Sequence, residues 1–354
     1  MAIALKDNLA EFYKGKRVLV TGHTGFKGSW LCLLLNALGA DISGIALAPQ
    51  ENSLFTLLPY DTYMDSRICD ITDLALLKET MKDIAPQIVI HLAAQAYVPS
   101  NACDYLPTLN TNVMGLANVL EAVSDVPSVR SVVIVTSDKC YQNNSAIEYS
   151  EASPLGCDEI YSASKACAEL VAKGYYKALL FKKDIHLATA RASNVLGGGD
   201  FNTDRLIPYI INTFLHEETA VLRNPDFIRP WQNVLDVLCG YLMLAKKLYE
   251  ESDTDFCSPF NFGPSSDGFA SVKELVALFM QYFPNAKYEI TSSTHKIEAA
   301  VLKLSSKKAN ELLHWHMKFS LPQTVAMTVD FHKRIYSGEK ALSICEFYIN
   351  KYFE

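Results

Sequence analysis

Three residues that can move protons follow an apolar run in the middle of the chain. The run Val132–Val135 is typical of a buried strand. Thr136, Asp138 and Lys139 come directly after it, in the segment Thr-Ser-Asp-Lys-Cys-Tyr. A hydroxyl, a carboxyl and an amine are groups that general acid–base catalysis uses. The segment is therefore either a polar turn or the mouth of a catalytic site.

A tyrosine and a lysine further along the chain have a spacing that brings them together. Tyr161 and Lys165 are four residues apart, so on a helix they share one face. A lysine ammonium beside a phenol favours the phenolate and lowers its pKa. Such a tyrosine can take a proton from a sugar hydroxyl while hydride leaves the same carbon. A Tyr-x-x-x-Lys spacing alone is common by chance. It becomes strong evidence for a catalytic pair only together with Thr136 and a glycine loop near the N-terminus.

That glycine loop lies between the first predicted strand and the first predicted helix. Gly22, Gly25 and Gly28 follow a Gly-x-x-Gly-x-x-Gly spacing, and Thr24, Phe26 and Lys27 lie among them. Residues without a Cβ let a pyrophosphate approach the backbone, and the helix N-terminus adds N–H groups and a positive dipole end. We therefore predict a dinucleotide site here rather than a plain turn.

The residues after the second and third strands bear on which dinucleotide binds. The second strand ends Ile45-Ala46-Leu47-Ala48, without the acid that usually holds the adenosine ribose and without an arginine for a 2′-phosphate. This favours NAD over NADP. Asp70, after the third strand, can accept from an adenine amino group. Its alternative role is a helix N-cap, which Thr72 or Asp73 serves equally well.

Strand-like and helix-like segments alternate through the first half of the chain. The predicted strands are 17–20, 42–47, 87–92, 131–137 and 185–190, and the predicted helices are 29–38, 74–84, 111–123 and 161–180. This alternation predicts an α/β fold, a Rossmann-like doubly wound parallel sheet. The pattern breaks after Arg191, which indicates a smaller α/β substrate-binding domain. We expect residues 1–192 to form the NAD-binding domain with 233–265 crossing back to it, and 193–232 with 266–354 to form the second domain.

The composition excludes several classes of partner. A net charge of −7 argues against nucleic acid, and no apolar run approaches the roughly 20 residues that span a bilayer. The nine cysteines include no Cys-x-x-Cys pair, and the N-terminal residues lack the pattern of a signal peptide. His314 and His316 have no ligand cluster around them. We expect a cytoplasmic protein without a metal site or a membrane partner.

Taken together, the motifs resemble the extended short-chain dehydrogenase/reductase family. Within it the chain is similar to the sugar-nucleotide 4,6-dehydratases, and most of all to the branch that acts on CDP-glucose. The resemblance covers nearly the whole chain. The motifs that carry it are Gly22–Gly28, His91–Gln95, Thr111–Gly115, Thr136–Tyr141, Asn194–Asp200, Asp204–Pro208, Arg223–Pro225 and Arg229–Gln232.

The resemblance implies an NAD-dependent cycle, used in deoxysugar and O-antigen biosynthesis. Tyr161, helped by Thr136, takes the C4 hydroxyl proton while hydride leaves C4. A base then removes the C5 proton, Asp138 protonates the departing C6 hydroxyl, and hydride returns to C6. The implied catalytic residues are Thr136, Asp138, Lys139, Tyr161 and Lys165. The implied NAD-binding residues are Gly22, Thr24, Gly25, Phe26, Lys27, Gly28, Asp70, Ile71, Leu92, Ala93, Ala94, Gln95, Asn112, Tyr161 and Lys165. The implied residues for a nucleoside diphosphate sugar are Asn194, Arg205, Leu206, Arg223 and Arg229.

Lys139 has two possible roles. It serves as the C5 base only if burial or positive neighbours lower its pKa, and otherwise it forms a salt bridge. Neighbours on a strand point to opposite faces, so Asp138 and Lys139 both reach the site only if the strand bends there. Trp231 has two possible roles as well, since it is as compatible with core packing as with stacking on the base.

The chain also departs from the family pattern. The departures are Ala96–Pro99, Gly156–Tyr161, Ser193, Phe201 and Asn233. We expect these positions to lie around the sugar and nucleotide pocket. A substrate with another nucleotide base or with a modified hexose therefore stays open.

Two further functions stay open at this stage. A nucleotide-sugar 4-epimerase shares the glycine loop, Tyr161 and Lys165 but has no need of Asp138 and Lys139. A dinucleotide-sensing regulator on the same fold typically loses the tyrosine or the lysine, and this chain keeps both. The resemblance also implies a homodimer or homotetramer, paired through helices 112–123 and 162–180.

Overall fold

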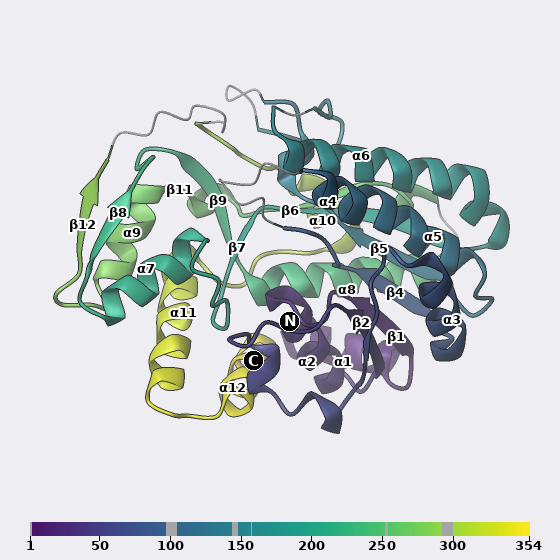
Figure 1. The fold of residues 1–354 in the computed structure, drawn as a ribbon, viewed down its shortest axis with the longest axis horizontal. Helices are drawn as coiled ribbons and strands as arrows, with labels where there is room; N and C mark the ends of the chain where they lie inside the picture. Colours follow the sequence, from purple (N-terminus) through teal and green to yellow (C-terminus); the bar gives the residue numbers. More distant parts are fainter. Residues whose placement is uncertain (1, 97–104, 144–147, 157, 252–253, 292–299) are drawn as a thin grey trace.

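The computed structural model describes residues 2–96, 105–143, 148–156, 158–251, 254–291 and 300–354. Seven parallel strands form its central sheet (Figure 1). They are β1 (Arg17–Thr21), β2 (Asp41–Ala46), β3 (Asp65–Ile68), β4 (Ile88–His91), β5 (Ser131–Val135), β6 (His186–Ala192) and β10 (Phe260–Phe262). The order in the sheet is β10-β6-β5-β4-β1-β2-β3, so it reverses between β1 and β4. Ligands bind at the carboxyl ends of strands beside such a reversal. The predicted α/β Rossmann-like fold is confirmed.

Helices cover both faces of this sheet. One face packs against α1 (Ala2–Tyr13), α2 (Phe26–Ala37), α8 (Val234–Glu250) and α12 (Ala341–Phe353). The other packs against α3 (Leu74–Ile84), α5 (Leu116–Ser124) and α6 (Ile160–Tyr175). Every residue of β4 and of β5 is buried. Strands covered on both faces need continuous apolar runs, which is the pattern the sequence shows.

A second group of elements lies beside this core (Figure 1). It has a three-stranded sheet in the order β11-β9-β7 and a two-stranded sheet in the order β12-β8. Its strands are β7 (Asn194–Leu196), β8 (Thr219–Leu222), β9 (Ile228–Asn233), β11 (Phe269–Ser271) and β12 (Lys287–Ile290), and its helices are α7 (Leu206–Leu215), α9 (Val272–Met280) and α11 (Leu321–Tyr336). These helices and strands share an apolar core of their own. The short helix α10 (Lys307–Leu313) instead contacts α8 and β10.

Several element boundaries differ from the prediction. The strand predicted over 131–137 ends at Val135, and one 3-10 turn, Asp138–Cys140, follows. The helix predicted over 111–123 begins earlier, as α4 (Leu106–Leu109), and reaches α5 through a π-helical turn. The predicted helix 161–180 ends as α6 at Tyr175 and continues as a second π-helical turn. Polar residues after a strand and helix irregularities leave little trace in apolar periodicity, so the sequence does not reveal them.

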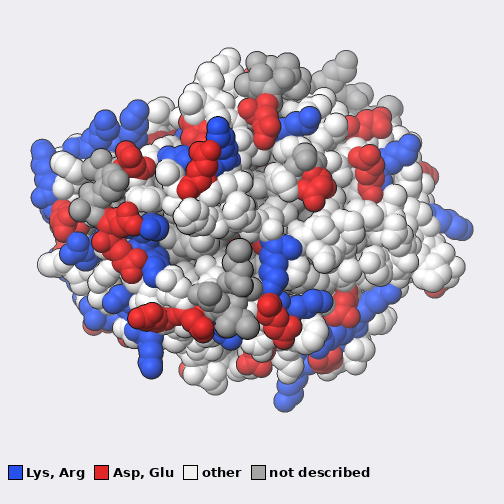
Figure 2. Space-filling view, turned by 180° about the vertical axis from the view of Figure 1, so that it is seen from behind, with Lys and Arg blue, Asp and Glu red and all other residues white. Residues whose placement is uncertain are grey.

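No helix in the described part of the chain is long and apolar enough to cross a membrane. On the face turned away from the viewer in Figure 1, Lys and Arg side chains alternate with Asp and Glu (Figure 2). As far as this face is described, it lacks a basic strip of the kind that follows a nucleic acid backbone.

Candidate active site

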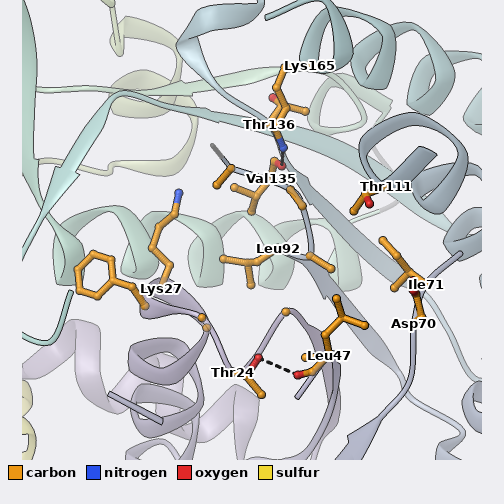
Figure 3. Close-up of a pocket in the computed structure, with 18 of the residues that line it drawn as sticks. Thr24, Lys27, Leu47, Asp70, Ile71, Leu92, Thr111, Val135, Thr136 and Lys165 are labelled. Atoms are coloured by element: carbon orange, nitrogen blue, oxygen red, sulfur yellow. Dashed lines mark hydrogen bonds between the residues drawn. The ribbon is translucent and has the colours of Figure 1, made fainter. Parts of the chain in front are cut away.

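A cavity of about 320 Å³ opens at the carboxyl ends of β1, β4 and β5, where the strand order reverses (Figure 3). Most of the residues predicted to bind a dinucleotide line it. They are Gly22, Thr24, Gly25, Phe26, Lys27, Gly28, Asp70, Ile71, Leu92, Ala93, Ala94, Tyr161 and Lys165, and Thr136 joins them. The fold therefore brings the glycine loop and the Tyr161–Lys165 pair to one cavity.

Two predicted dinucleotide residues lie just outside this cavity lining. The Gln95 backbone N–H donates to Asn112 Oδ1 at 2.8 Å, and Asn112 Nδ2 donates to the Gln95 carbonyl at 3.1 Å. Asn112 Nδ2 also donates to Ser164 Oγ at 2.9 Å. In this structure the pair ties the loop after β4 to helix α6, which supports the wall of the cavity.

The glycine loop has room for backbone but not for side chains. Gly22 has φ +75°, and a Cβ there would lie 2.7 Å from the Ala93 nitrogen. A Cβ on Gly28 would lie 2.2 Å from the Gly22 carbonyl oxygen. Gly25 precedes α2 as its N-cap, so the first N–H groups of that helix face the cavity rim. This tight backbone cradle fits the pyrophosphate of a dinucleotide.

Asp70 is available to the cavity because another residue caps the next helix. Asp73 accepts from the Leu76 N–H at 3.1 Å and is the N-cap of α3. Asp70 Oδ1 accepts from the Thr72 N–H at 2.9 Å, within its own turn. Of the two roles open from the sequence, helix capping therefore belongs to Asp73. Across the cavity, Thr24 Oγ1 donates to the Leu47 carbonyl at 3.2 Å (Figure 3).

The turn after β5 lets two neighbouring side chains reach the site. Asp138 and Lys139 belong to a 3-10 turn, in which side chains are about 120° apart rather than opposed. Asp138 is 3% exposed, and Lys139 Nζ lies 5.9 Å from the centre of the Tyr161 ring. The bend that the sequence required for both residues is present.

Two adjacent hydroxyls follow β5, those of Thr136 and Ser137, and they have different partners. Thr136 Oγ1 donates to Glu169 Oε1 at 2.5 Å, beneath the cavity floor. Ser137 Oγ donates to Asp138 Oδ1 at 3.2 Å, and the Ser137 hydroxyl also lowers the pKa of Tyr161. Successive residues in extended backbone point to opposite sides, so a shift of one residue decides which hydroxyl faces the tyrosine.

Glu169 anchors a buried polar network behind the site, and the sequence reasoning missed it. Its carboxylate accepts from Thr189 Oγ1 at 2.7 Å and forms an ion pair with Arg191 at 2.7 Å. Arg191 in turn donates to the Tyr141 hydroxyl at 2.8 Å. One signal was present in the sequence, because Glu169 follows Lys165 by four residues and shares its helix face.

Burial sets the pKa values of the catalytic cluster. It raises the pKa of Tyr161 to about 12, and the hydrogen bond from Ser137 opposes this. It raises the pKa of Asp138 to about 6, against the pull of Lys139. It lowers the pKa of Lys165 to about 8, while Glu169 favours the charged form. The Lys165 side chain donates to the Val135 carbonyl at 3.4 Å.

A second cavity of about 580 Å³ adjoins the first. It holds all five residues predicted for the sugar nucleotide, which are Asn194, Arg205, Leu206, Arg223 and Arg229. Lys139 lines this second cavity, and Arg205 lines both, so the two form one continuous site. Arg205 also forms an ion pair with Asp200 at 2.9 Å.

The three arginines of the second cavity differ in exposure. Arg229 is buried, stacks 5.1 Å from the Phe227 ring centre and donates to the Ile228 carbonyl at 2.9 Å. Arg223 is exposed. Trp231 is 4% exposed and donates to the Ala270 carbonyl, so it belongs to the core of the second group of elements while reaching the cavity wall.

The family departures lie less close to the substrate than predicted. Ser193 accepts from Gln232 Nε2 at 2.7 Å, and Asn233 is the N-cap of α8. Neither lines the two cavities, whereas Ala96, another of the departures, lines the first. Phe201 packs on His332, with ring centres 5.2 Å apart. The departures at 97–99 and at Cys157 lie outside the described residues.

Comparisons with known proteins agree with this site. Residues 18–256 match the model of the NAD dependent epimerase/dehydratase family. The chain is 41% identical over 342 residues to a CDP-glucose 4,6-dehydratase of Salmonella typhimurium, covering 94% of this chain and 95% of that one. It is 25% identical over 334 residues to a UDP-glucose 4-epimerase of Mycoplasma pneumoniae, covering 91% and 98%.

Solved structures share the fold at lower identity. The epimerase Mth375 of Methanothermobacter thermautotrophicus has a TM-score of 0.82 at 22% identity, covering 94% of this chain and 96% of that one. A dTDP-glucose 4,6-dehydratase of Bacillus anthracis, solved with NAD, has a TM-score of 0.74 at 21% identity, covering 92% and 99%.

Proposed function

The chain belongs to the NAD dependent epimerase/dehydratase family, and from this premise we propose that it is a sugar-nucleotide 4,6-dehydratase that converts CDP-glucose to CDP-4-keto-6-deoxyglucose. One observation carries the proposal. A buried carboxyl, Asp138, lies close enough to Tyr161 for its charge to act on the tyrosine, and its neighbour Lys139 lines the second cavity, in a chain 41% identical to a CDP-glucose 4,6-dehydratase. A 4-epimerase needs the tyrosine but has no use for an acid there.

NAD is the cofactor, and the glycine cradle with Asp70, Tyr161 and Lys165 would hold it. When bound, it supplies reversible hydride transfer at C4 and C6 of the sugar. The chain supplies the proton transfers. Tyr161 receives the C4 hydroxyl proton, and Asp138 protonates the hydroxyl that leaves C6. The Asp138 Oδ2 atom is buried and has no hydrogen-bond partner among the described residues, so a substrate hydroxyl would satisfy it.

Lys139 is proposed as the base that removes the C5 proton, since it faces the cavity from the turn that holds Asp138. Lys27 is a second candidate. Burial and the charges of Lys165 and Arg205 lower its pKa to about 8, which makes it a usable base near neutral pH. Exchange of the C5 hydrogen in D₂O distinguishes them, because only removal of the true base, in Lys139→Met or Lys27→Met, stops it.

The charges of the second cavity suit a nucleoside diphosphate. Arg205, Arg223 and Arg229 line it in a chain whose net charge is −7, so positive groups are concentrated where a diphosphate would bind. Guanidinium groups bind such oxygens through charge-assisted hydrogen bonds.

The function is tested with a panel of CDP-, UDP-, dTDP- and GDP-glucose and NAD. We expect a 4-keto-6-deoxy product, detected by its alkaline absorbance, with CDP-glucose as the best substrate. A preference for another nucleotide would support the dehydratase reaction but identify a different substrate. CDP-galactose as product would establish the epimerase, and NAD binding without turnover of any sugar would favour the regulator.

The proposal includes a homodimer paired through helices 112–123 and 162–180. The two helical segments lie side by side (Figure 1), and they expose Met114 and Leu170, while α4, just before the first segment, exposes Leu106. Exposed apolar side chains on adjacent helices are typical of a subunit interface. Light scattering after gel filtration measures the assembly and distinguishes a dimer from a tetramer.

The proposal also divides the chain into two domains. The NAD-binding domain is 1–192 with 233–265, and the substrate domain is 193–232 with 266–354. Support comes from α8 and β10, which pack in the core of the large sheet although the second group of elements flanks them in the chain. A cytoplasmic location is proposed because the described cysteines form no disulfide, as is usual in a reducing compartment.

A further inference from the structure

The 3-10 turn Asp138–Cys140 is held by buried side chains on both of its sides. Before the turn, Thr136 Oγ1 donates to Glu169 Oε1 at 2.5 Å. Directly after the turn, the Tyr141 hydroxyl accepts from Arg191 Nη1 at 2.8 Å. All four of these side chains are buried. The side chains that the turn carries are therefore fixed by contacts made on both sides of it.

These contacts on the two sides of the turn converge on one buried ion pair. Arg191 Nη2 lies 2.7 Å from Glu169 Oε2, and the two side chains are 3% and 2% exposed. The forked guanidinium holds the carboxylate with one arm and the Tyr141 hydroxyl with the other. A single ion pair thus joins the segment before the turn to the residue after it.

The ion pair also connects the turn to the helix that carries the catalytic tyrosine. Tyr161, Lys165 and Glu169 follow one another at four-residue intervals in α6, so they share one face of that helix. C4 oxidation uses the first two of these residues, whereas the later steps use Asp138 and Lys139 of the turn. The placement of the second pair relative to the first therefore depends on the contact between the helix and the turn.

We propose that the Glu169–Arg191 ion pair positions the two catalytic side chains of the turn through its hydrogen bond to Tyr141, and that this contact serves elimination at C5 and C6 rather than C4 oxidation. This rests on the proposed dehydratase function. Tyr141 lines neither of the two cavities, so it acts only through the turn. A shift of about 1 Å in a catalytic group can slow a step by about 100-fold, so one hydroxyl behind the turn can matter.

The surroundings of Tyr141 allow its hydroxyl to be removed while the ring stays in place. The ring stacks on Tyr149, with centres 4.9 Å apart and planes 4° apart. Tyr141→Phe keeps this stack and loses the hydrogen bonds to Arg191 and to Asn261 Oδ1. Arg191 keeps its ion pair and its donation to the Glu151 carbonyl at 3.2 Å. The variant therefore removes the contact with the turn and retains the rest of the network.

Stopped-flow absorbance of NADH separates the two halves of the reaction during a single turnover of CDP-glucose by the NAD-bound enzyme. The rise of NADH measures C4 oxidation, and its decay measures elimination with hydride return to C6. In Tyr141→Phe we expect an unchanged rise and a decay slower by about tenfold or more, so that NADH accumulates. Tyr13→Phe is the matched control, since it removes another buried hydroxyl, which donates to the Leu242 carbonyl at 2.8 Å. Both phases of the control should equal those of the wild type.

Arg191→Lys tests the ion pair itself. An ammonium keeps the positive charge but lacks the fork that reaches Glu169 and Tyr141 together. We expect its NADH decay to slow as well. The double variant Tyr141→Phe/Arg191→Lys should be no slower than Arg191→Lys alone, because both changes break the same contact. Additive slowing in the double variant would contradict a shared contact.

A Tyr141→Phe variant with the same NADH decay as Tyr13→Phe overturns the proposal. Equal slowing of the rise and the decay also overturns it, because a general loss of stability would give that result. Thermal unfolding followed by circular dichroism confirms that each variant is folded at the assay temperature. The product of the wild type is analysed in parallel. A wild type that makes no 4-keto-6-deoxy sugar refutes the dehydratase function, whereas product formation with normal decay in Tyr141→Phe refutes the positioning role alone.

Discussion

The cofactor half and the substrate half of the site are built in different ways. The cofactor half is built around one short segment, Gly22–Gly28, whose closest contacts are backbone to backbone, and the ends of neighbouring strands complete its lining. The substrate half gathers Lys139, Arg205 and Arg229 from segments far apart in the chain. The first half is specified by the shape of the backbone and the second by charge. Substitutions in the cofactor half should therefore weaken NAD binding by steric clash. Substitutions in the substrate half should weaken substrate binding by loss of electrostatic attraction.

The largest effect on cofactor binding is expected from adding one methyl group to the cofactor half. In Gly28→Ala the new Cβ would lie 2.2 Å from the Gly22 carbonyl oxygen, which cannot move without opening the cradle. Overpacking of this kind costs about 1–3 kcal/mol, so NAD binding should weaken by about 5-fold to 100-fold. Gly174→Ala in α6 is the matched control, since a Cβ there meets nothing within 4 Å. Calorimetric NAD titration measures both, and unchanged affinity in Gly28→Ala would contradict the steric account.

Tyr161→Phe should affect the chemistry of the site and leave both halves intact. Loss of the hydroxyl removes the acceptor of the C4 proton, so turnover should fall by about 10²–10⁴-fold. Affinities for NAD and CDP should stay within a few-fold, because the ring is retained. Product formation and two ligand titrations give the comparison. Substantial remaining turnover would move the proton acceptor to another residue.

Asp138→Asn should distinguish dehydration from epimerisation. The amide keeps the shape of the side chain but cannot protonate the hydroxyl leaving C6. Formation of the 4-keto-6-deoxy product should fall by about 10²–10⁴-fold. A 4-epimerase would keep nearly normal turnover in this variant, so the product assay decides between the two reactions.

The smallest effects are expected in the substrate half, from single arginines. Arg229→Ala removes a buried charge and should raise the KM for CDP-glucose by about tenfold or more, since a charged hydrogen bond contributes about 1.5–3 kcal/mol. Arg223→Ala should raise the KM by a smaller factor, because Arg223 is exposed to solvent. Arg67→Ala, which removes a surface ion pair with Asp65 and Asp83, is the control and should leave KM unchanged. Equal CDP affinity in all three variants would make the cavity arginines structural.

The sequence alone determined the features that depend on local spacing. The glycine spacing predicts a tight backbone turn because Gly25 and Gly28 lie against the Gly22 carbonyl oxygen, only a few residues away. The alternating strands and helices implied a parallel sheet, since right-handed crossovers allow few other arrangements. The four-residue spacing put Tyr161 and Lys165 on one helix face, and both line the same cavity.

Only the tertiary structure decided which neighbouring side chain faces the substrate. Thr136 and Ser137 are adjacent hydroxyls, and the choice between them depends on β5 ending at Val135 and on Glu169 holding Thr136 from below. The 3-10 turn that follows holds Lys139 in the lining of the second cavity and keeps Asp138 buried next to it. Side-chain direction reverses with every residue of extended backbone, so it is set by where a strand ends and by what packs behind it. Those contacts come from residues more than 30 positions away, beyond the range of any local pattern in the sequence.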